Sequence, residues 1–413
     1  MTEEKKLWQK GGGWLLEVPE RVYTPEDFDE SVKEIARTTR TFVEREVLHL
    51  LERMEHGELE LNVPLMRKAG ELGLLAIDVP EEYGGLDLPK VISTVVAEEL
   101  SGSGGFSVTY GAHTSIGTLP LVYFGTEEQK RKYLPKLASG EWIAAYCLTE
   151  PGSGSDLASL RTKAERQGDH YVVNGQKIWT SYANLADWMF CLVRTDTRTK
   201  HGGISFVVFD MRTAGVETRP IRLISGDSPF CETFLTDVRV PKDQLIGPLN
   251  GGWEIAKRLL MHERTNISAE AFGNAAGLDL IETARQFVGL REGVLANTDL
   301  RARIARHRMR DEAFRLAVQQ ARTGHGRSSS AATSALASSF KVAAASLNQE
   351  RCELLLECLG HEGLGWEGEG FSTDALRATR HWLRSKGNSI EGGTTEINLN
   401  VIAKRVLGLP DPV

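Results

Sequence analysis

The sequence lacks the usual marks of a membrane protein or a nucleic-acid-binding protein. None of its apolar runs approaches the ~20 residues that a helix needs to cross a bilayer. Acidic residues outnumber basic ones, 56 to 49, and the net charge is -7. A broad nucleic-acid interface needs a basic face. We therefore expect neither a membrane span nor a nucleic-acid partner.

Cysteine is also scarce, with five in 413 residues, and none forms a C-x-x-C pair or a zinc-type spacing with histidine. Reduced thiols and the absence of a metal site are the simplest expectation. The first six residues, Met-Thr-Glu-Glu-Lys-Lys, are charged and have no apolar core behind them. This start does not resemble a secretory signal, so we expect a cytoplasmic protein.

The hydrophobic period divides the chain into three parts. Up to residue 140, apolar residues recur every three or four positions, as in the run behind the helix-start signal Thr24-Pro25. From Thr162 to about Leu245, short β-branched and aromatic runs alternate with turns, and Gly168-Asp169 and Asn174-Gly175 each predict a hairpin. From Gly251 the helical period returns. We expect an α+β multidomain protein with a helical domain at 1–140, an antiparallel sheet or small barrel at 141–249 and a helical domain at 250–413.

One stretch has the composition of a ligand-binding loop. Tyr146 to Asp156 reads Tyr-Cys-Leu-Thr-Glu-Pro-Gly-Ser-Gly-Ser-Asp, with hydroxyls, backbone N–H groups and no large side chain after the tyrosine. Such a loop can present donors and acceptors to a flat, polar-edged molecule. Pro-Gly and Ser-Gly pairs also mark ordinary surface turns, and the composition does not separate the two interpretations.

A carboxylate lies within the apolar stripe of the first helix after the sheet. Glu263 falls at helical spacing with Trp253, Leu260 and Ile267. Burial among such residues raises the pKa of a carboxyl group, which suits a general base. Spacing by itself favours a structural carboxylate, paired with Arg264 or with an amide, because most buried carboxylates are structural.

Several of these segments together resemble the acyl-CoA dehydrogenase family over essentially the whole chain. The resemblance is carried by residues 74–85, Phe124–Lys130, Tyr146–Asp156, Asn174–Trp179, Ile390–Ile397 and Arg405–Pro410. It implies a helical domain, a central antiparallel β-barrel and a C-terminal helical bundle. It also implies FAD as cofactor, an acyl-CoA substrate, an electron-transfer flavoprotein as acceptor, and a role in fatty-acid β-oxidation.

The resemblance assigns roles to single residues. Tyr146, Leu148 and Thr149 match positions that line the flavin ring and its pyrimidine edge. Ser155 matches a pyrophosphate contact, Trp179 an aromatic residue at the flavin, and Ser181 a hydroxyl near flavin N5. Thr394 and Glu396 match positions near the adenosine half. At the substrate, the resemblance implies Gly392, Arg264 and Ser155.

The base is where this chain differs from much of the family. Many members place a catalytic Glu directly before the Gly-Thr of the final turn, but here that position is Gly392, and Glu391 lies one residue earlier. A minority, resembling isovaleryl- and long-chain-type enzymes, carries the base on a helix directly before an arginine, as in Glu263-Arg264. The expected base is therefore Glu263, with Glu391 as the alternative.

The implied reaction is α,β-dehydrogenation of an acyl-CoA to the trans-2-enoyl-CoA, in a homo-oligomer that is a tetramer or a dimer. Two family segments near the inter-subunit half of the cofactor site are altered, namely Arg285–Gly289 and Glu357–His361. They leave open a hetero-oligomer with an incomplete set of flavin sites. The alternatives within the same fold are a flavin monooxygenase and a non-catalytic, nucleic-acid-associated member.

Overall fold

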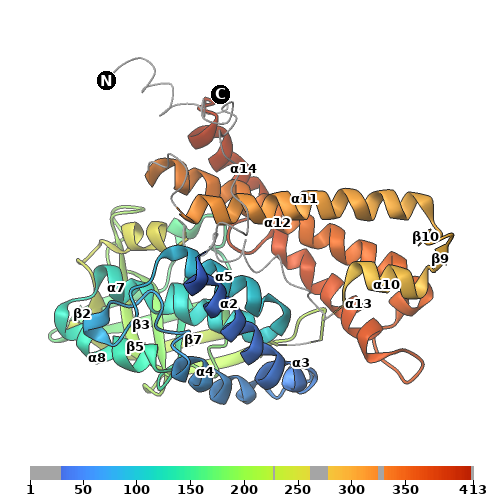
Figure 1. Cartoon of the computed structure of the whole chain (residues 1–413). Coiled ribbons are helices and arrows are strands. Elements are labelled where there is room, and N and C mark those ends of the chain that lie inside the picture. Colours follow the sequence, from blue (N-terminus) through green and yellow to red (C-terminus); the bar gives the residue numbers. More distant parts are fainter. Residues whose placement is uncertain (1–28, 227, 261–277, 324–329, 411–413) are drawn as a thin grey trace. The chain divides into compact units, whose positions relative to one another are not determined.

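The computed structural model describes residues 29–226, 228–260, 278–323 and 330–410. The chain divides into two compact units. One unit contains residues 38–96 and 103–263, and the other contains residues 1–37, 97–102 and 264–413. The large β-sheet belongs to the first unit and the long C-terminal helices belong to the second, so each unit has a hydrophobic core of its own (Figure 1).

Helices dominate the described part of the first 140 residues, as the sequence predicted. At one helix start, the Thr126 hydroxyl accepts the Gln129 N–H at 3.3 Å and the Gln129 side chain accepts the Thr126 N–H at 3.0 Å. This capping box satisfies two N–H groups. The expected start at Thr24 lies outside the described residues. The α-helices of this region are α2 (Glu30–Phe42), α3 (Leu51–Glu55), α4 (Asn62–Glu71), α5 (Lys90–Leu100), α6 (Gly105–Gly111), α7 (Leu119–Phe124) and α8 (Glu127–Ala138).

The central region forms one eight-stranded sheet. Its hydrogen-bonded order is β6-β7-β3-β2-β4-β5-β8, and β1 pairs with β4 off this path. Most neighbours are antiparallel, but β1 runs parallel to β4 and β2 makes a short parallel contact with β4. The strands are β1 (Ala144–Cys147), β2 (Lys163–Gln167), β3 (His170–Ser181), β4 (Trp188–Arg194), β5 (Ile204–Asp210), β6 (Val216–Ile221), β7 (Phe230–Pro241) and β8 (Leu245–Ile246).

The predicted closed barrel is wrong, because this sheet is open. Its path ends at β6 and β8, and these two described strands do not pair with each other. β6 has the composition of an edge strand, since Pro220 cannot donate a ladder hydrogen bond and Glu217 and Arg219 are exposed. A barrel closes only when both terminal strands pair, and the charged, proline-containing β6 disfavours such pairing.

The two predicted hairpins have different outcomes. Gly168-Asp169 forms a two-residue turn, since Gln167 pairs with His170 across it. Asn174-Gly175 is not a turn, because β3 continues through it with a register irregularity against β7. A Cβ atom at position 175 would lie 2.5 Å from the Thr162 hydroxyl oxygen. The glycine therefore permits close approach of two backbones rather than a chain reversal.

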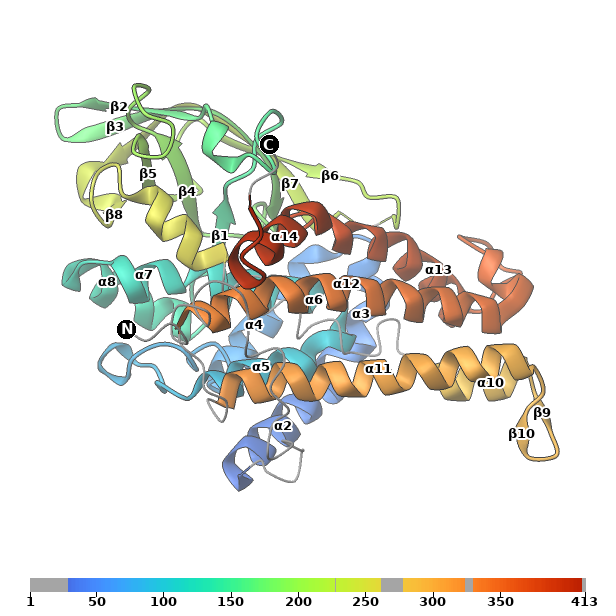
Figure 2. The same ribbon diagram turned by 90° about the horizontal axis from the view of Figure 1, so that it is seen from above.

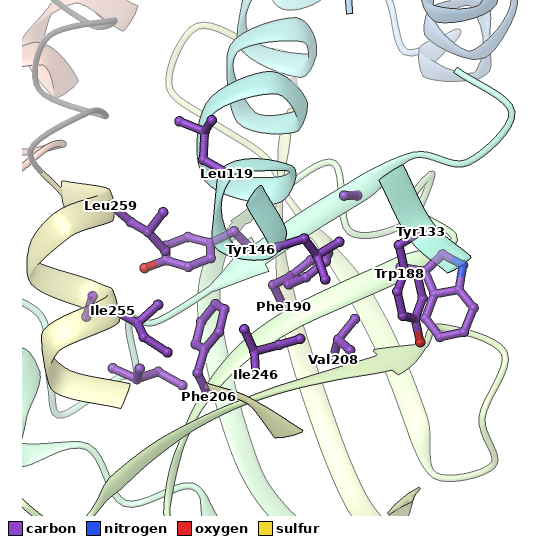
Figure 3. Packing of buried hydrophobic residues seen from close by; sticks show 14 of the residues in the cluster. Leu119, Tyr133, Tyr146, Trp188, Phe190, Phe206, Val208, Ile246, Ile255 and Leu259 are labelled. Carbon is purple, nitrogen blue, oxygen red and sulfur yellow. The ribbon is translucent and has the colours of Figure 1, made fainter. Parts of the chain in front are cut away.

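Alternate residues of β1 face two different apolar cores. Tyr146 lies in a core formed with α7, α8 and the helical residues 252–260, whereas Cys147 lies in a second core between strands. Figure 3 shows the first core, where the Tyr146 ring lies near Phe206 with 5.7 Å between ring centroids and beside Ile255 and Leu259. Because both faces of β1 are buried, the strand fixes the direction of the chain that leaves it.

The second unit is built on long helices. α11 (Thr298–Thr323), α12 (Ser330–Leu359) and α13 (Thr373–Ser385) lie side by side (Figures 1 and 2). Arg303 pairs with Glu357 at 2.8 Å across the first two of them. The remaining elements are α10 (Leu280–Phe287), the hairpin of β9 (Leu290–Arg291) and β10 (Val294–Leu295), and α14 (Thr395–Val401). The predicted C-terminal helical domain is confirmed.

Candidate functional site

The loop that leaves β1 presents unused hydrogen-bond donors. Leu148 is 8% exposed and Thr149 is half-buried. Among the described residues, neither backbone N–H has an acceptor, although the Thr149 carbonyl accepts the Ile178 N–H at 2.9 Å. Buried backbone N–H groups are nearly always paired in proteins. Two successive unpaired donors at a strand end therefore indicate a place for an acceptor on a ligand.

The rest of the loop is a compact turn with an open outer side. Glu150 and Ser153 exchange backbone hydrogen bonds of 3.1 and 3.0 Å, and the buried Ser153 hydroxyl donates to the Asp156 carbonyl at 2.8 Å. A Cβ atom at Gly152 would meet nothing within 4 Å, and Ser155 is exposed. The loop thus has a fixed backbone and room beside it, as a bound cofactor requires.

A buried ion pair holds this loop in place. The Lys177 ammonium lies 2.9 Å from Glu150 Oε1, and the two side chains are 0% and 7% exposed. Glu150 also accepts the N–H groups of Arg161 and Thr162. Burial alone would raise the pKa of Glu150, but the Lys177 cation and these hydrogen bonds outweigh burial and lower it. The carboxylate is therefore charged near neutral pH.

Trp179 has an unusual backbone conformation for its residue type. Its φ is +63°, and the β3–β7 register shifts between Lys177 and Thr180, which marks a bulge. Trp179 is 51% exposed, and its indole meets Phe230 edge-on at 6.2 Å between ring centroids. A bulge redirects a side chain, and a left-handed aromatic residue is strained, so both features are typical of functional sites. Ser181 follows on the same strand and is half-buried.

Six of the predicted cofactor residues therefore belong to one unit of the structure. They are joined through the hydrogen bond between Ile178 and Thr149, which ties β3 to the loop. The sequence interpretation did not assign a role to Glu150 or to Lys177. One signal was present: Lys177 occupies an inward position of an alternating strand, where a charge requires a partner. The six residues are Tyr146, Leu148, Thr149, Ser155, Trp179 and Ser181.

The second group of predicted residues lies in the other unit, at the turn before α14. Gly392 and Gly393 have φ values of +63° and +84°, which glycine adopts without strain. The Asn398 amide donates to the Gly393 carbonyl at 2.9 Å, and the Thr394 hydroxyl accepts the Ile397 N–H at 3.2 Å as the helix cap. Glu396 is exposed in the first helical turn. The turn has a defined backbone shape with its peptide groups partly accessible.

The two candidate bases differ in what the structure shows of them. Glu391 is fixed by a 2.8 Å ion pair with Arg384 and a 2.5 Å hydrogen bond from Asn388. Burial alone would raise the pKa of Glu391, but these partners lower it overall. A base for a weakly acidic C–H needs a raised pKa instead. Glu263 and Arg264 lie outside the described residues.

Two other classes of feature are absent from the described chain. No helix within it combines the length and the hydropathy needed to cross a bilayer. No three His, Cys, Asp or Glu side chains among the described residues gather in a way that could hold a metal ion.

Comparison with known proteins links the two groups of residues to one family. Family models for the N-terminal, middle and C-terminal domains of acyl-CoA dehydrogenases match residues 29–141, 145–238 and 250–407. A "Probable acyl-CoA dehydrogenase" of Bacillus subtilis (strain 168) is 44% identical over 273 residues, which is 64% of this chain and 45% of that relative. The matched part is thus less than half of that relative.

Two solved structures are similar over nearly the whole chain. An acyl-CoA dehydrogenase complexed with FAD from Bacillus anthracis is 34% identical, with a TM-score of 0.82, covering 95% of this chain and 71% of that one. A protein described as the Tcur3481-Tcur3483 steroid ACAD is 30% identical, with a TM-score of 0.80, covering 94% of this chain and 100% of that one. Both matches include the sheet and the C-terminal helices.

Proposed function

Because the chain belongs to the acyl-CoA dehydrogenase family, we propose that it catalyses the FAD-dependent α,β-dehydrogenation of an acyl-CoA thioester. The observation that carries this proposal is the loop after β1, where the N–H groups of Leu148 and Thr149 have no acceptor among the described residues. Donors fixed by the fold stabilise negative charge at a bound group without having to reorganise. The product is the trans-2-enoyl-CoA.

We propose these roles for the predicted cofactor residues. Tyr146, Leu148 and Thr149 would hold the flavin ring, and the exposed Ser155 hydroxyl would face the pyrophosphate. Trp179 and Ser181 would contact the ring from β3, and Thr394 and Glu396 would lie near the adenosine half. FAD, when bound, supplies the acceptor for the β-hydride.

Glu263 is the proposed base that takes the α-proton. Gly392 has no side chain at the usual family position, and Glu391 is already paired with Arg384. Gly392 would offer its backbone N–H to the thioester carbonyl, and Arg264 and Ser155 would lie at the substrate. The substrate carbonyl, held by such a donor, makes the α-proton easier to remove.

The acyl group is proposed to be bulky or branched. A helix-borne base resembles family members that accept such chains, and one similar structure is described as a steroid enzyme. An electron-transfer flavoprotein is the proposed electron acceptor, and a homo-oligomer is the proposed assembly. The domain limits at 140 and 249, the role in fatty-acid β-oxidation and the cytoplasmic location stay predictions.

The test is an anaerobic titration of FAD-loaded protein with straight-chain, branched and ring-bearing acyl-CoAs, followed by flavin absorbance. We expect bleaching, strongest with the bulky chains. Bleaching should be lost in Glu263→Gln, which still binds FAD, and kept in the matched variant Glu391→Gln. Absence of bleaching with every acyl-CoA would overturn the proposed function, and rapid oxygen consumption by the reduced protein would indicate a monooxygenase instead.

A further inference from the structure

The Glu150–Lys177 pair holds both ends of the loop at residues 148–162, which we call the cofactor loop. Glu150 accepts from the N–H groups of Arg161 at 2.6 Å and Thr162 at 2.8 Å, so it joins the start of the loop to its end. Lys177 donates to the Leu148 carbonyl at 3.0 Å as well as to Glu150. The Lys177 ammonium thus connects Leu148, the first residue after β1, with the carboxylate of Glu150 in the loop.

The contact with the Leu148 carbonyl has an electronic consequence. That carbonyl and the Thr149 N–H belong to the same peptide group, and the Thr149 N–H is one of the two donors without an acceptor in the described part of the chain. A cation at the oxygen draws electron density from the peptide, and hydrogen bonds in such a chain strengthen one another. The Thr149 N–H is therefore a stronger donor than an ordinary amide.

The charges themselves act in the same region. Lys177 is fully buried, so water screens its field little, whereas exposed charges are strongly screened. The positive charge favours negative charge on a ligand at the unpaired donors. Glu150, at 2.9 Å from the ammonium, opposes that effect. Replacing Lys177 by a neutral residue should therefore make the electrostatic potential at the loop more negative. Replacing Glu150 should make it more positive.

We propose that Glu150 and Lys177 are positioning residues that set the reduction potential of the bound flavin through the Leu148–Thr149 peptide. The inference rests on the proposed function, because it requires FAD at this loop. Lys177 raises the affinity for the reduced, more negative cofactor relative to the oxidised one, and Glu150 limits that preference.

A purely structural pair would behave differently. Removing either member of a buried pair leaves an uncompensated charge and destabilises the fold. Both single variants would then lose thermal stability and bind both forms of FAD more weakly, without a change in the preference between them. The sign of the potential shift separates the two explanations, since only an electrostatic role gives opposite signs.

The experiment measures the midpoint potential of FAD bound to full-length protein by equilibration with a reference dye, together with the Kd of oxidised FAD. For Lys177→Met we expect the preference for reduced FAD to fall about tenfold, which lowers the potential by about 30 mV for a two-electron couple. For Glu150→Gln, which keeps an oxygen to accept hydrogen bonds, we expect the midpoint potential of bound FAD to rise. The double variant should lie between them.

The control is Lys163→Met, which removes an exposed lysine that pairs with the exposed Glu165 on β2. It should leave the potential unchanged. Shifts of the same sign in both single variants, or no shift, would overturn the inference. If Lys177→Met does not fold, Glu150→Gln alone decides, since a lowered or unchanged potential contradicts the proposal. Failure of the wild-type protein to bind FAD would instead overturn the proposed function.

Discussion

His113 should make the unit that carries the cofactor loop sensitive to acid. This histidine lies in a π-helical segment, η8 (Ala112–Gly117), and is 0% exposed. Its Nδ1 accepts the Ala144 N–H at 3.2 Å, so Nε2 carries the hydrogen and donates to the Leu137 carbonyl at 2.9 Å. The neutral ring thus connects α8 to the first residue of β1. Protonation of Nδ1 would place a hydrogen against the Ala144 N–H.

The size of the effect follows from the titration of this group. Burial lowers the pKa of His113 from 6.5 to about 4, with the Leu137 carbonyl opposing part of the shift. The unfolded chain therefore takes up the proton first as the pH falls. The stabilisation is complete above pH 6.5, decreases between pH 6.5 and about 4, and does not change further below that. At 1.36 kcal/mol per pKa unit, the total is about 3 kcal/mol, of which about 2 kcal/mol is lost by pH 5.

Urea unfolding at pH 7.5 and pH 5.0 tests this estimate. His113→Gln should lower the free energy of unfolding at pH 7.5 by ~1–3 kcal/mol, because its hydrogen bonds are only partly replaced. Between pH 7.5 and pH 5.0, the free energy of unfolding of this variant should decrease by ~2 kcal/mol less than that of the wild type. His56→Gln, which replaces an exposed histidine of the same unit, should keep the wild-type decrease. An unchanged decrease in His113→Gln would refute the reasoning.

Two further substitutions test the backbone of the site. Gly175→Ala should lower the free energy of unfolding by ~1–3 kcal/mol, because its Cβ would lie 2.5 Å from the Thr162 hydroxyl oxygen. The control is Gly370→Ala in the same urea assay. It should have little effect, because a Cβ atom there would meet nothing within 4 Å. Trp179→Gly should relieve ~1–3 kcal/mol of strain at a φ of +63°, so the FAD-free variant should be at least as stable as the FAD-free wild type. FAD binding, measured by fluorescence titration, should weaken at least tenfold. A clear loss of stability in Trp179→Gly would show that the indole is a packing residue instead.

The sequence predicted the class of structure because periodicity is a local property. Short β-branched runs between turns can satisfy their hydrogen bonds only in a sheet, and the Thr126–Gln129 pattern is itself a helix start. The closed barrel was wrong because closure depends on whether β6 and β8 meet, and no local pattern contains that information. The hairpin predicted at Asn174-Gly175 was wrong for the same reason, since the need for glycine came from Thr162, the residue directly before the neighbouring strand β2.

For the site as well, the sequence determined some features and only the tertiary structure decided others. The composition of Tyr146–Asp156 and the resemblance to a family identified the loop and, through Gly392, directed attention away from the usual position of the base. Only the tertiary structure showed that Glu391 is paired with Arg384, because an ion pair is a matter of distance rather than of spacing. It alone showed that Lys177 reaches the Leu148 carbonyl and that the amides of Leu148 and Thr149 remain unpaired within the described chain. Sequence determines which groups a chain carries, and the fold decides which of them meet.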